Sequence, residues 1–270
     1  MPMQWNLADL FEATADAVAD RTAIVCGDRR FTYRELDERA TRLANHLAAH
    51  GVGRGDHVGL YLYNGPEYVE GTFAAYKLGA VPINVNYRYV EGELAYLFDN
   101  ADLKALIHGR EFVDRIAHVA PDAPKLTVFV SVEDGTDADL AAIGAVEYEA
   151  ALAAASPARD FAPRAEEDLY ILYTGGTTGM PKGVMWRQED IFYTLCGGID
   201  AYTNEKVQRP EELTIPKSRP DVRVTSTLKR TRTTCMKWPS GFLVCVPTRM
   251  PLAGSTRSIW VPAKIGRAHV

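Results

Sequence analysis

The sequence predicts an α/β fold in which parallel sheets are flanked by helices, followed by an irregular C-terminal segment. Over the first 173 residues, segments with helical spacing of apolar residues alternate with short apolar runs that are typical of strands. Strands that alternate with helices favour parallel sheets covered by helices on their faces. With 270 residues, 47% of them hydrophobic, the chain is also long enough to bury a core.

Capping residues place the first helices. Asn6 precedes apolar residues at helical spacing and is expected to cap a helix over residues 7–18. Thr32 and Glu35 form the pattern of a capping box, and the helix that they begin is expected to end at Gly51. The other elements follow by the same reasoning. We expect strands at 22–26, 58–63, 80–85, 103–108, 125–130 and 168–173, helices at 66–78, 90–98 and 112–119, and a short helix at 146–154 within a loop region at 131–167.

The segment YTGGTTGMPKGVMW, residues 173–186, follows the last of these strands and is expected to form a loop. Three glycines would let backbone amides approach an anion, three threonines add hydroxyl donors, and Lys182 adds a positive charge. This composition suits a polyphosphate. The spacing excludes a Walker loop, because Lys182 is followed by Gly183, and the G-x-G-x-x-G fingerprint is absent.

The same segment resembles the signature loop of the adenylate-forming superfamily, usually written Y-T-S-G-T-T-G-x-P-K-G. It agrees at ten of eleven positions and departs at Gly175, where the family usually has serine. The resemblance extends to FTYRELDERATRLANHL (31–47), YKLGAVPINVNYRY (76–89) and ELAYLFDN (93–100). GGTTGMPKGVMWRQEDI together with NYRYVEGELAYLFDNADLKALIH looks most similar to the actinobacterial fatty-acyl and steroid side-chain CoA ligases.

This resemblance implies an AMP-forming acid-thiol ligase, an acyl-CoA synthetase. Such an enzyme activates a small-molecule carboxylic acid with ATP and Mg²⁺ and passes the acyl group to coenzyme A. Lys182 is the implied catalytic residue, and no residue is assigned as a metal ligand. The implied binding residues for the β- and γ-phosphates are Thr174, Gly175, Gly176, Thr177, Thr178, Gly179 and Lys182. A non-catalytic nucleotide-binding or nucleic-acid-binding module is the alternative.

Four other candidates for functional residues are not assigned a functional role. His46 and His50 are four residues apart, as in a metal-binding pair, but the end of a helix favours histidine electrostatically and no third ligand is evident. Arg88 is expected to pair with an acidic neighbour rather than to touch substrate, and Trp186 is expected to pack. Lys264 does not have the context of the family's C-terminal lysine.

Composition predicts a cytoplasmic protein without a transmembrane segment. The four cysteines form no C-x-x-C pair, the N-terminus has no basic head before an apolar stretch, and no apolar run approaches the roughly 20 residues that span a bilayer. The partner that the resemblance implies is a small carboxylic acid, and no nucleic-acid partner is expected.

Residues 201–270 differ from the rest of the chain in charge. They hold 13 of the 30 Lys and Arg residues but only 4 of the 35 Asp and Glu residues. We therefore expect a partial AMP-binding domain at 1–200 and a divergent or out-of-frame, poorly ordered segment at 201–270. A basic nucleic-acid-binding tail and a divergent continuation of the ligase remain alternatives. The last seven residues, KIGRAHV, resemble the translation of a common sequencing-library adapter.

Several further family patterns do not occur in the 270 residues. These are the aromatic-Gly-x-Thr-Glu segment, whose glutamate helps to hold Mg²⁺, the Thr-Gly-Asp segment, whose aspartate binds the ribose, and the lysine segment of the mobile domain. We expect the chain to be inactive by itself.

Overall fold

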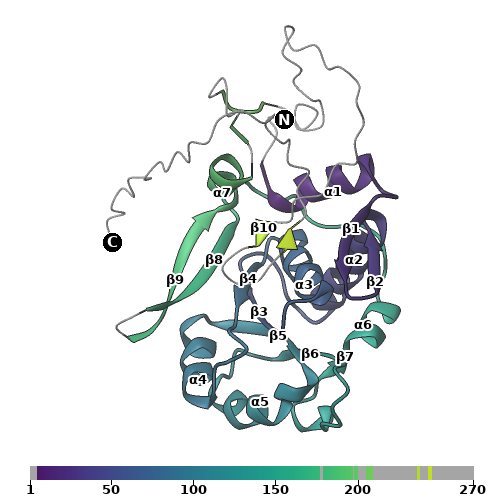
Figure 1. Cartoon of the computed structure of the whole chain (residues 1–270). Coiled ribbons are helices and arrows are strands. Elements are labelled where there is room, and N and C mark those ends of the chain that lie inside the picture. The colour runs from purple at the N-terminus through teal and green to yellow at the C-terminus, as the bar shows by residue number, and fades with distance from the viewer. Residues whose placement is uncertain are drawn as a thin grey trace, which may run out of the picture. The chain divides into compact units, whose positions relative to one another are not determined.

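A sheet of seven strands, six of them parallel, forms the centre of the fold (Figure 1). The computed structural model describes residues 5–176, 179–196, 198–199, 205–208, 236–237 and 243–244. The strand order is β7-β6-β5-β3-β4-β8-β9, and β9 runs antiparallel to β8. The strands are β3 (His57–Tyr61), β4 (Val81–Asn84), β5 (Leu103–Gly109), β6 (Val128–Val132), β7 (Val146–Glu147), β8 (Leu169–Gly176) and β9 (Gly179–Arg187). The predicted α/β class is confirmed.

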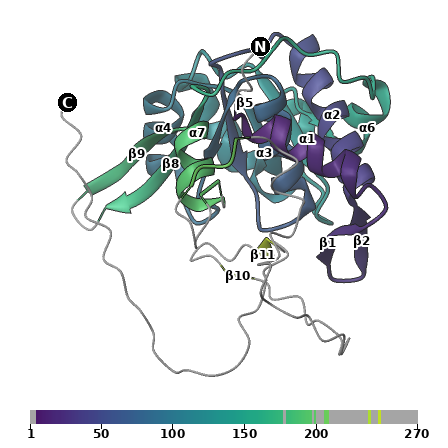
Figure 2. The ribbon, with the colours of Figure 1, turned by 90° about the horizontal axis from the view of Figure 1, so that it is seen from above.

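Helices cover both faces of the sheet (Figure 2). Among the described residues they are α1 (Leu7–Ala17), α2 (Tyr33–Ala49), α3 (Pro66–Lys77), α4 (Glu91–Asn100), α5 (Val113–Val119), α6 (Tyr148–Ala154) and α7 (Gln188–Leu195). The chain passes through α3 from β3 to β4 on one side, and through α4 and α5 to β5 and β6 on the other side. Because such crossovers are right-handed, opposite directions of travel place their helices on opposite faces.

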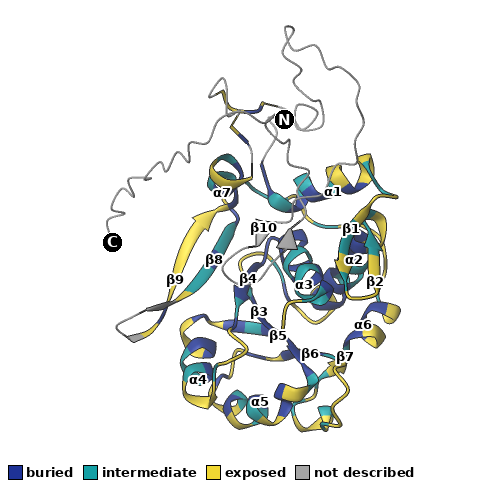
Figure 3. Ribbon diagram, in the orientation of Figure 1, coloured by how far each residue is buried: buried dark blue, intermediate teal, exposed yellow. Residues whose placement is uncertain are grey.

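The core has one cluster on each face of the sheet, and the buried residues in Figure 3 follow the strands and the inner sides of the helices. Leu43 and Leu47 of α2 pack with Ala74 of α3 over one face. Leu94 of α4 and Ile116 of α5 pack over the other face. Apolar residues on both faces of a strand are typical of a parallel sheet covered on two sides.

The predicted caps are present. The Asn6 side chain accepts a hydrogen bond from the amide of Ala8 at the start of α1. Thr32 and Glu35 form a reciprocal capping box at the start of α2. After α2, Gly51 has a φ of +85°, a left-handed conformation that glycine adopts without steric cost.

Besides the strand β9 and the helix α7, two short strands were not predicted from the sequence. β1 (Thr22–Cys26), which was expected, pairs with an unexpected β2 (Arg29–Thr32) in a hairpin outside the main sheet. Residues 146–147, which were expected to begin a helix, form β7, and the helix α6 follows at Tyr148. β6 begins at Val128 rather than at the expected residue 125. Runs of two to four residues carry too little periodicity to be separated from turns.

The chain divides into two units, Met1–Thr225 and Ser226–Val270. In the second unit the structure describes an antiparallel pair, β10 (Met236–Lys237) and β11 (Leu243–Val244). The expectations for residues 201–270 fall mainly outside the described residues, which include only 205–208, 236–237 and 243–244 of that range. Within the described part of the chain, no helix is long and apolar enough to cross a membrane.

Candidate functional site

The glycine- and threonine-rich segment lies mostly in a hairpin made by β8 and β9. The expectation of a loop over residues 173–186 was wrong, because β8 continues to Gly176 and β9 already begins at Gly179. Cross-strand pairing with β8 holds β9 extended, although two glycines, a proline and a lysine within it are poor strand formers. Ile171 of β8 pairs with Ile83 of β4 and thereby joins the hairpin to the sheet.

The hairpin register is irregular next to its tip. Thr174 pairs with Lys182 and Gly176 pairs with Gly179, so one β8 residue between these pairs opposes two residues of β9, Met180 and Pro181. This is the count of a β-bulge, and proline is tolerated there because it has no amide hydrogen to offer to the ladder.

Thr174 and Lys182 are brought together by this register. They are direct cross-strand partners, so their side chains lie on the same face of the hairpin, with Cβ atoms about 5 Å apart in such pairs. Both residues are exposed, and no carboxylate among the described residues pairs with Lys182. The backbones of Gly175, Gly176 and Gly179 lie in the two strands, whereas Thr177 and Thr178 lie outside the described residues.

The opposite face of the hairpin is supported by an aromatic ring that the sequence analysis did not identify as part of the site. A Cβ atom added to Gly183 would come within 3.1 Å of the ring of Tyr173, its cross-strand partner. The Tyr173 hydroxyl donates a hydrogen bond of 2.9 Å to Asn100 Oδ1 at the end of α4. Burial raises the pKa of Tyr173, which keeps the hydroxyl protonated as the donor. A side chain at position 183 would therefore require the Tyr173 ring to shift by a few tenths of an ångström.

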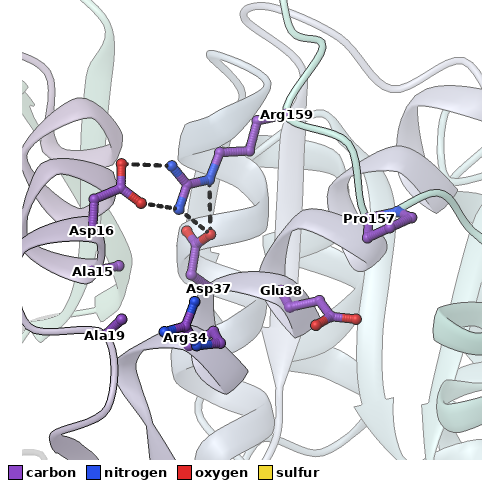
Figure 4. Close-up of a pocket in the computed structure, with 8 residues that line it drawn as sticks. All are labelled: Ala15, Asp16, Ala19, Arg34, Asp37, Glu38, Pro157 and Arg159. Carbon is purple, nitrogen blue, oxygen red and sulfur yellow. Dashed lines mark hydrogen bonds and ion pairs between the residues drawn. The ribbon is translucent and has the colours of Figure 1, made fainter.

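A separate cavity of about 480 Å³ lies between α1, α2 and the segment at residues 157–159 (Figure 4). Arg159 forms two hydrogen bonds with Asp16, of 2.9 and 3.0 Å, and also pairs with Asp37, while Arg34 pairs with Asp20. Both arginines of the cavity are thus already paired with carboxylates. Its lining contains no residue of the predicted phosphate loop: Ala15, Asp16, Ala19, Arg34, Asp37, Glu38, Pro157 and Arg159.

A comparison with protein families covers the hairpin. The sequence profile of the AMP-binding enzymes matches residues 11–218, a range that includes the whole hairpin. The chain belongs to the AMP-binding enzyme family.

Relatives of this AMP-binding chain include characterised ligases. It is 52% identical over 217 residues to the medium/long-chain-fatty-acid–CoA/3-oxocholest-4-en-26-oate–CoA ligase of Mycobacterium marinum, covering 79% of this chain and 40% of the relative. It is 54% identical over 206 residues to the 3-oxocholest-4-en-26-oate–CoA ligase of Rhodococcus rhodochrous, covering 76% and 37%. The chain thus spans about 40% of the length of the curated relatives that it matches.

Solved structures show the same architecture. The N-terminal domain of FACL13 from Mycobacterium tuberculosis aligns with a TM-score of 0.60 at 27% identity, covering 70% of this chain and 46% of that one. The anthranilate CoA ligase AuaEII, in complex with anthranoyl-AMP, aligns with a TM-score of 0.66 at 27% identity, covering 73% and 38%. The fold of this AMP-binding chain is therefore that of the N-terminal domain of acyl-CoA ligases.

The remaining candidates lie elsewhere in this AMP-binding chain. The rings of His46 and His50 are 4.3 Å apart, and His50 Nδ1 faces the carbonyl oxygen of His46 at 2.8 Å, a contact within one helix end. Burial, together with the nearby His50, lowers the pKa of His46. No group of three or more His, Cys, Asp or Glu residues in the described part of the chain could hold a metal ion.

Two expectations for single residues were wrong. Arg88 does not pair with an acidic neighbour among the described residues. Its guanidinium carbon lies over the ring of Tyr87, 5.3 Å from the ring centroid. Trp186 was expected to pack but is 40% exposed, because β9 is the edge strand of the sheet.

Proposed function

We propose that the β8–β9 hairpin holds the β- and γ-phosphates of ATP in an acyl-CoA ligase of which this chain is a segment. The observation that carries the proposal is the exposed cross-strand pair of Thr174 and Lys182 next to a glycine-rich strand end. In open α/β sheets, ligands bind outside the carboxyl ends of parallel strands, and the tip of the hairpin follows the carboxyl end of β8. Lys182 has no carboxylate partner among the described residues and can neutralise a phosphate oxygen.

In the proposed reaction, a carboxylate oxygen of the substrate bonds to the α-phosphorus of ATP while the bond to the leaving pyrophosphate breaks. The products are the acyl-adenylate and pyrophosphate, and the thiol of coenzyme A then displaces AMP. Lys182 offsets negative charge that develops on the leaving pyrophosphate, and the Thr174 hydroxyl donates to the same group. The backbone amides near Gly175, Gly176 and Gly179 add donors where no Cβ atom obstructs the phosphate.

Mg²⁺ enters this proposal as a partner of the nucleotide. Bound to the phosphates, it would neutralise part of their charge. The described residues do not supply a cluster of metal ligands, so the proposed role of the hairpin is limited to contacts with phosphate oxygens.

The proposed substrate is a carboxylic acid with a large apolar body. The names of the relatives from M. marinum and R. rhodochrous include medium- and long-chain fatty acids and 3-oxocholest-4-en-26-oate, a steroid acid. Their identity to this chain, 52–54% over more than 200 residues, supports the same class of substrate.

Titration with inorganic tripolyphosphate tests the phosphate site without requiring residues that bind adenosine or the acyl group. We expect Lys182→Ala to weaken binding about tenfold to a hundredfold, because one charge-assisted hydrogen bond contributes about 1.5–3 kcal/mol. Lys125→Ala is the matched control, since Lys125 is exposed and pairs with Asp102 at the surface. Equal affinity of wild type and Lys182→Ala would contradict the assignment of Lys182.

A chimera tests the ligase reaction. It joins residues 1–218, where the family match ends, to the part of the M. marinum relative that follows its aligned region. We expect acyl-CoA and AMP to form from ATP, coenzyme A and a fatty or steroid acid, and Lys182→Ala to slow the reaction. A folded chimera that binds tripolyphosphate but forms no AMP with any of these acids would contradict the proposed activity.

A further inference from the structure

We propose that Asn6, Asp168 and Gln188 form a polar latch that sets the direction in which the β8–β9 hairpin projects, and that they act as positioning residues for Thr174 and Lys182. This inference rests on the proposed function of the hairpin. Asp168 immediately precedes β8, and Gln188 immediately follows β9, so the two residues flank the base of the hairpin. Asn6 is the residue that caps α1, more than 150 positions earlier in the chain.

The first half of the latch joins α1 to the beginning of β8. Asn6 Nδ2 donates to Asp168 Oδ2 and to the carbonyl oxygen of Ala165, both at 3.1 Å, while its Oδ1 accepts from the amide of Ala8 at 2.9 Å. The other carboxylate oxygen, Asp168 Oδ1, accepts from Arg54 Nη1 at 2.7 Å. Asn6 is 0% exposed and Asp168 is 8% exposed. In so little water, an unmade bond to either group is costly, so the arrangement is strongly specified.

The second half joins α1 to the end of β9. Gln188 Oε1 accepts a hydrogen bond of 2.9 Å from the amide of Leu7, one of the orphan donors in the first turn of α1. The backbone amide of Gln188 donates at 2.9 Å to the carbonyl oxygen of Asp168, which closes the base of the hairpin. Gln188 is 0% exposed. Both ends of the hairpin are therefore attached to the same end of α1.

Beyond its base, the described hairpin is attached to the body of the domain through β8. Ile171 pairs with Ile83 of β4 and is buried in the core, Leu169 and Tyr173 pack against the same core, and Tyr173 donates a hydrogen bond to Asn100 of α4. The base is where both strands of the hairpin are held to α1. Almost all of β9 is exposed, as Figure 3 shows along that strand.

Because the hairpin is long, a small rotation at its base produces a large displacement of the residues near its tip. At about 3.4 Å per residue, the end of β8 lies roughly 27 Å from Asp168. A rotation of about 5° at the base would thus displace the phosphate-binding residues by about 2 Å, and misplacement of about 1 Å is enough to reduce catalysis strongly. Orientation of the base is therefore an efficient way to position Thr174 and Lys182.

Asn6→Ser tests the latch without removing the helix cap. Serine is a good N-cap residue and can still accept from the amide of Ala8, but it has no amide group to donate to Asp168. We expect hydrogen exchange of the amides in 169–176 and 179–187 to become at least tenfold faster, with no change in β3 and β5. We also expect the dissociation constant for inorganic tripolyphosphate to rise at least threefold in the folded variant.

Asn45→Ser is the matched control. Asn45 Nδ2 donates hydrogen bonds to the carbonyl oxygens of Ser156 and Ala158, in the segment between α6 and β8. It therefore holds the same segment as Asn6 does, but away from the base of the hairpin. We expect this variant to leave hairpin exchange and tripolyphosphate affinity unchanged. If Asn6→Ser does not fold, Gln188→Met, which keeps the apolar part of the side chain and removes the bond to Leu7, is measured in the same way.

The outcomes separate the latch from the proposed function. Unchanged hairpin exchange in the folded latch variant overturns the latch, and faster exchange with unchanged affinity overturns its positioning role. Absence of tripolyphosphate binding in the wild-type chain overturns the phosphate site instead, and the exchange comparison then still decides whether the latch holds the hairpin.

Discussion

His108 is a buried histidine at the carboxyl end of β5. In the sheet register it lies between Tyr61 of β3 and Ser131 of β6, and it has no exposed surface. His108 Nδ1 lies 2.9 Å from the carbonyl oxygen of Gly109, and His108 Nε2 has no hydrogen-bond partner among the residues that the structure describes. Burial lowers the pKa of His108 from 6.5 to about 4, so the folded protein holds a neutral imidazole at neutral pH.

This histidine makes stability depend on pH. Because the folded-state pKa lies below the unfolded-state value, the unfolded state binds more protons between pH 6.5 and about 4, and the free energy of unfolding falls as the pH falls. The full contribution is about 3 kcal/mol. We expect His108→Gln to lose less stability than wild type between pH 7.5 and 4.5 in urea unfolding. Equal losses in the two proteins would show that His108 does not titrate in this way.

Lys77 is a fully buried cation that joins three helices. Its ammonium group donates to Glu12 of α1 at 2.5 Å and to Asp37 of α2 at 2.8 Å. Arg164 pairs with the same glutamate and Arg159 with the same aspartate. Although burial opposes ionisation, the hydrogen bonds from Arg164 and Lys77 hold the pKa of Glu12 below its usual value. These ion pairs hold the helices α1, α2 and α3 against one another.

Removal of this cation should be costly. We expect Lys77→Met to lower the free energy of unfolding by about 3 kcal/mol, because it leaves buried carboxylates short of a partner. Lys125→Met, at an exposed ion pair with Asp102, should change it by less than about 1 kcal/mol. Urea unfolding of both variants checks the difference, and similar small effects would mean that the arginines alone satisfy the carboxylates.

At the scale of elements, β9 is unusual because it is both an edge strand and apolar. Val184, Met185 and Trp186 are 42%, 68% and 40% exposed. An edge strand also presents unpaired backbone groups, so exposed apolar side chains on it favour association between chains.

A charge on this strand should reduce association. We expect Met185→Lys to lower light scattering as the 270-residue chain is concentrated, because lysine on an edge opposes pairing with another strand. Val25→Lys is the control, since Val25 is 53% exposed but lies in the separate β1–β2 hairpin. If both variants scatter equally, β9 is not the surface through which chains associate.

At the scale of the whole molecule, the proposed phosphate site is not sufficient for the complete ligase reaction. The 270 residues contain the signature segment but not the family patterns for the Mg²⁺ glutamate or the ribose aspartate. We expect no ATP–pyrophosphate exchange above background by the purified chain with fatty or steroid acids, even where it binds tripolyphosphate. Exchange that Lys182→Ala abolishes would show that the chain is sufficient for adenylation.

The sequence by itself was enough for the α/β class and the family, and it also indicated the segment for which we propose phosphate binding. Helix periodicity, the caps at Asn6 and Thr32, and the spacing of glycines, threonines and Lys182 are local patterns, so a short stretch of chain contains all the information they need. The strands β2, β7 and β9 were missed, because pairing with a distant or neighbouring strand, not local propensity, makes them extended.

Only the tertiary structure decided how the hairpin is held. The cap residue Asn6 has a clear local role, and nothing local indicates that its amide also reaches Asp168, 162 positions later, or that Gln188 binds the amide of Leu7. The same holds for Tyr173 and Asn100, and for the exposure of Trp186. Such contacts depend on which elements become neighbours in the folded sheet, and this is decided by packing of the whole domain rather than by the order of residues along any one segment.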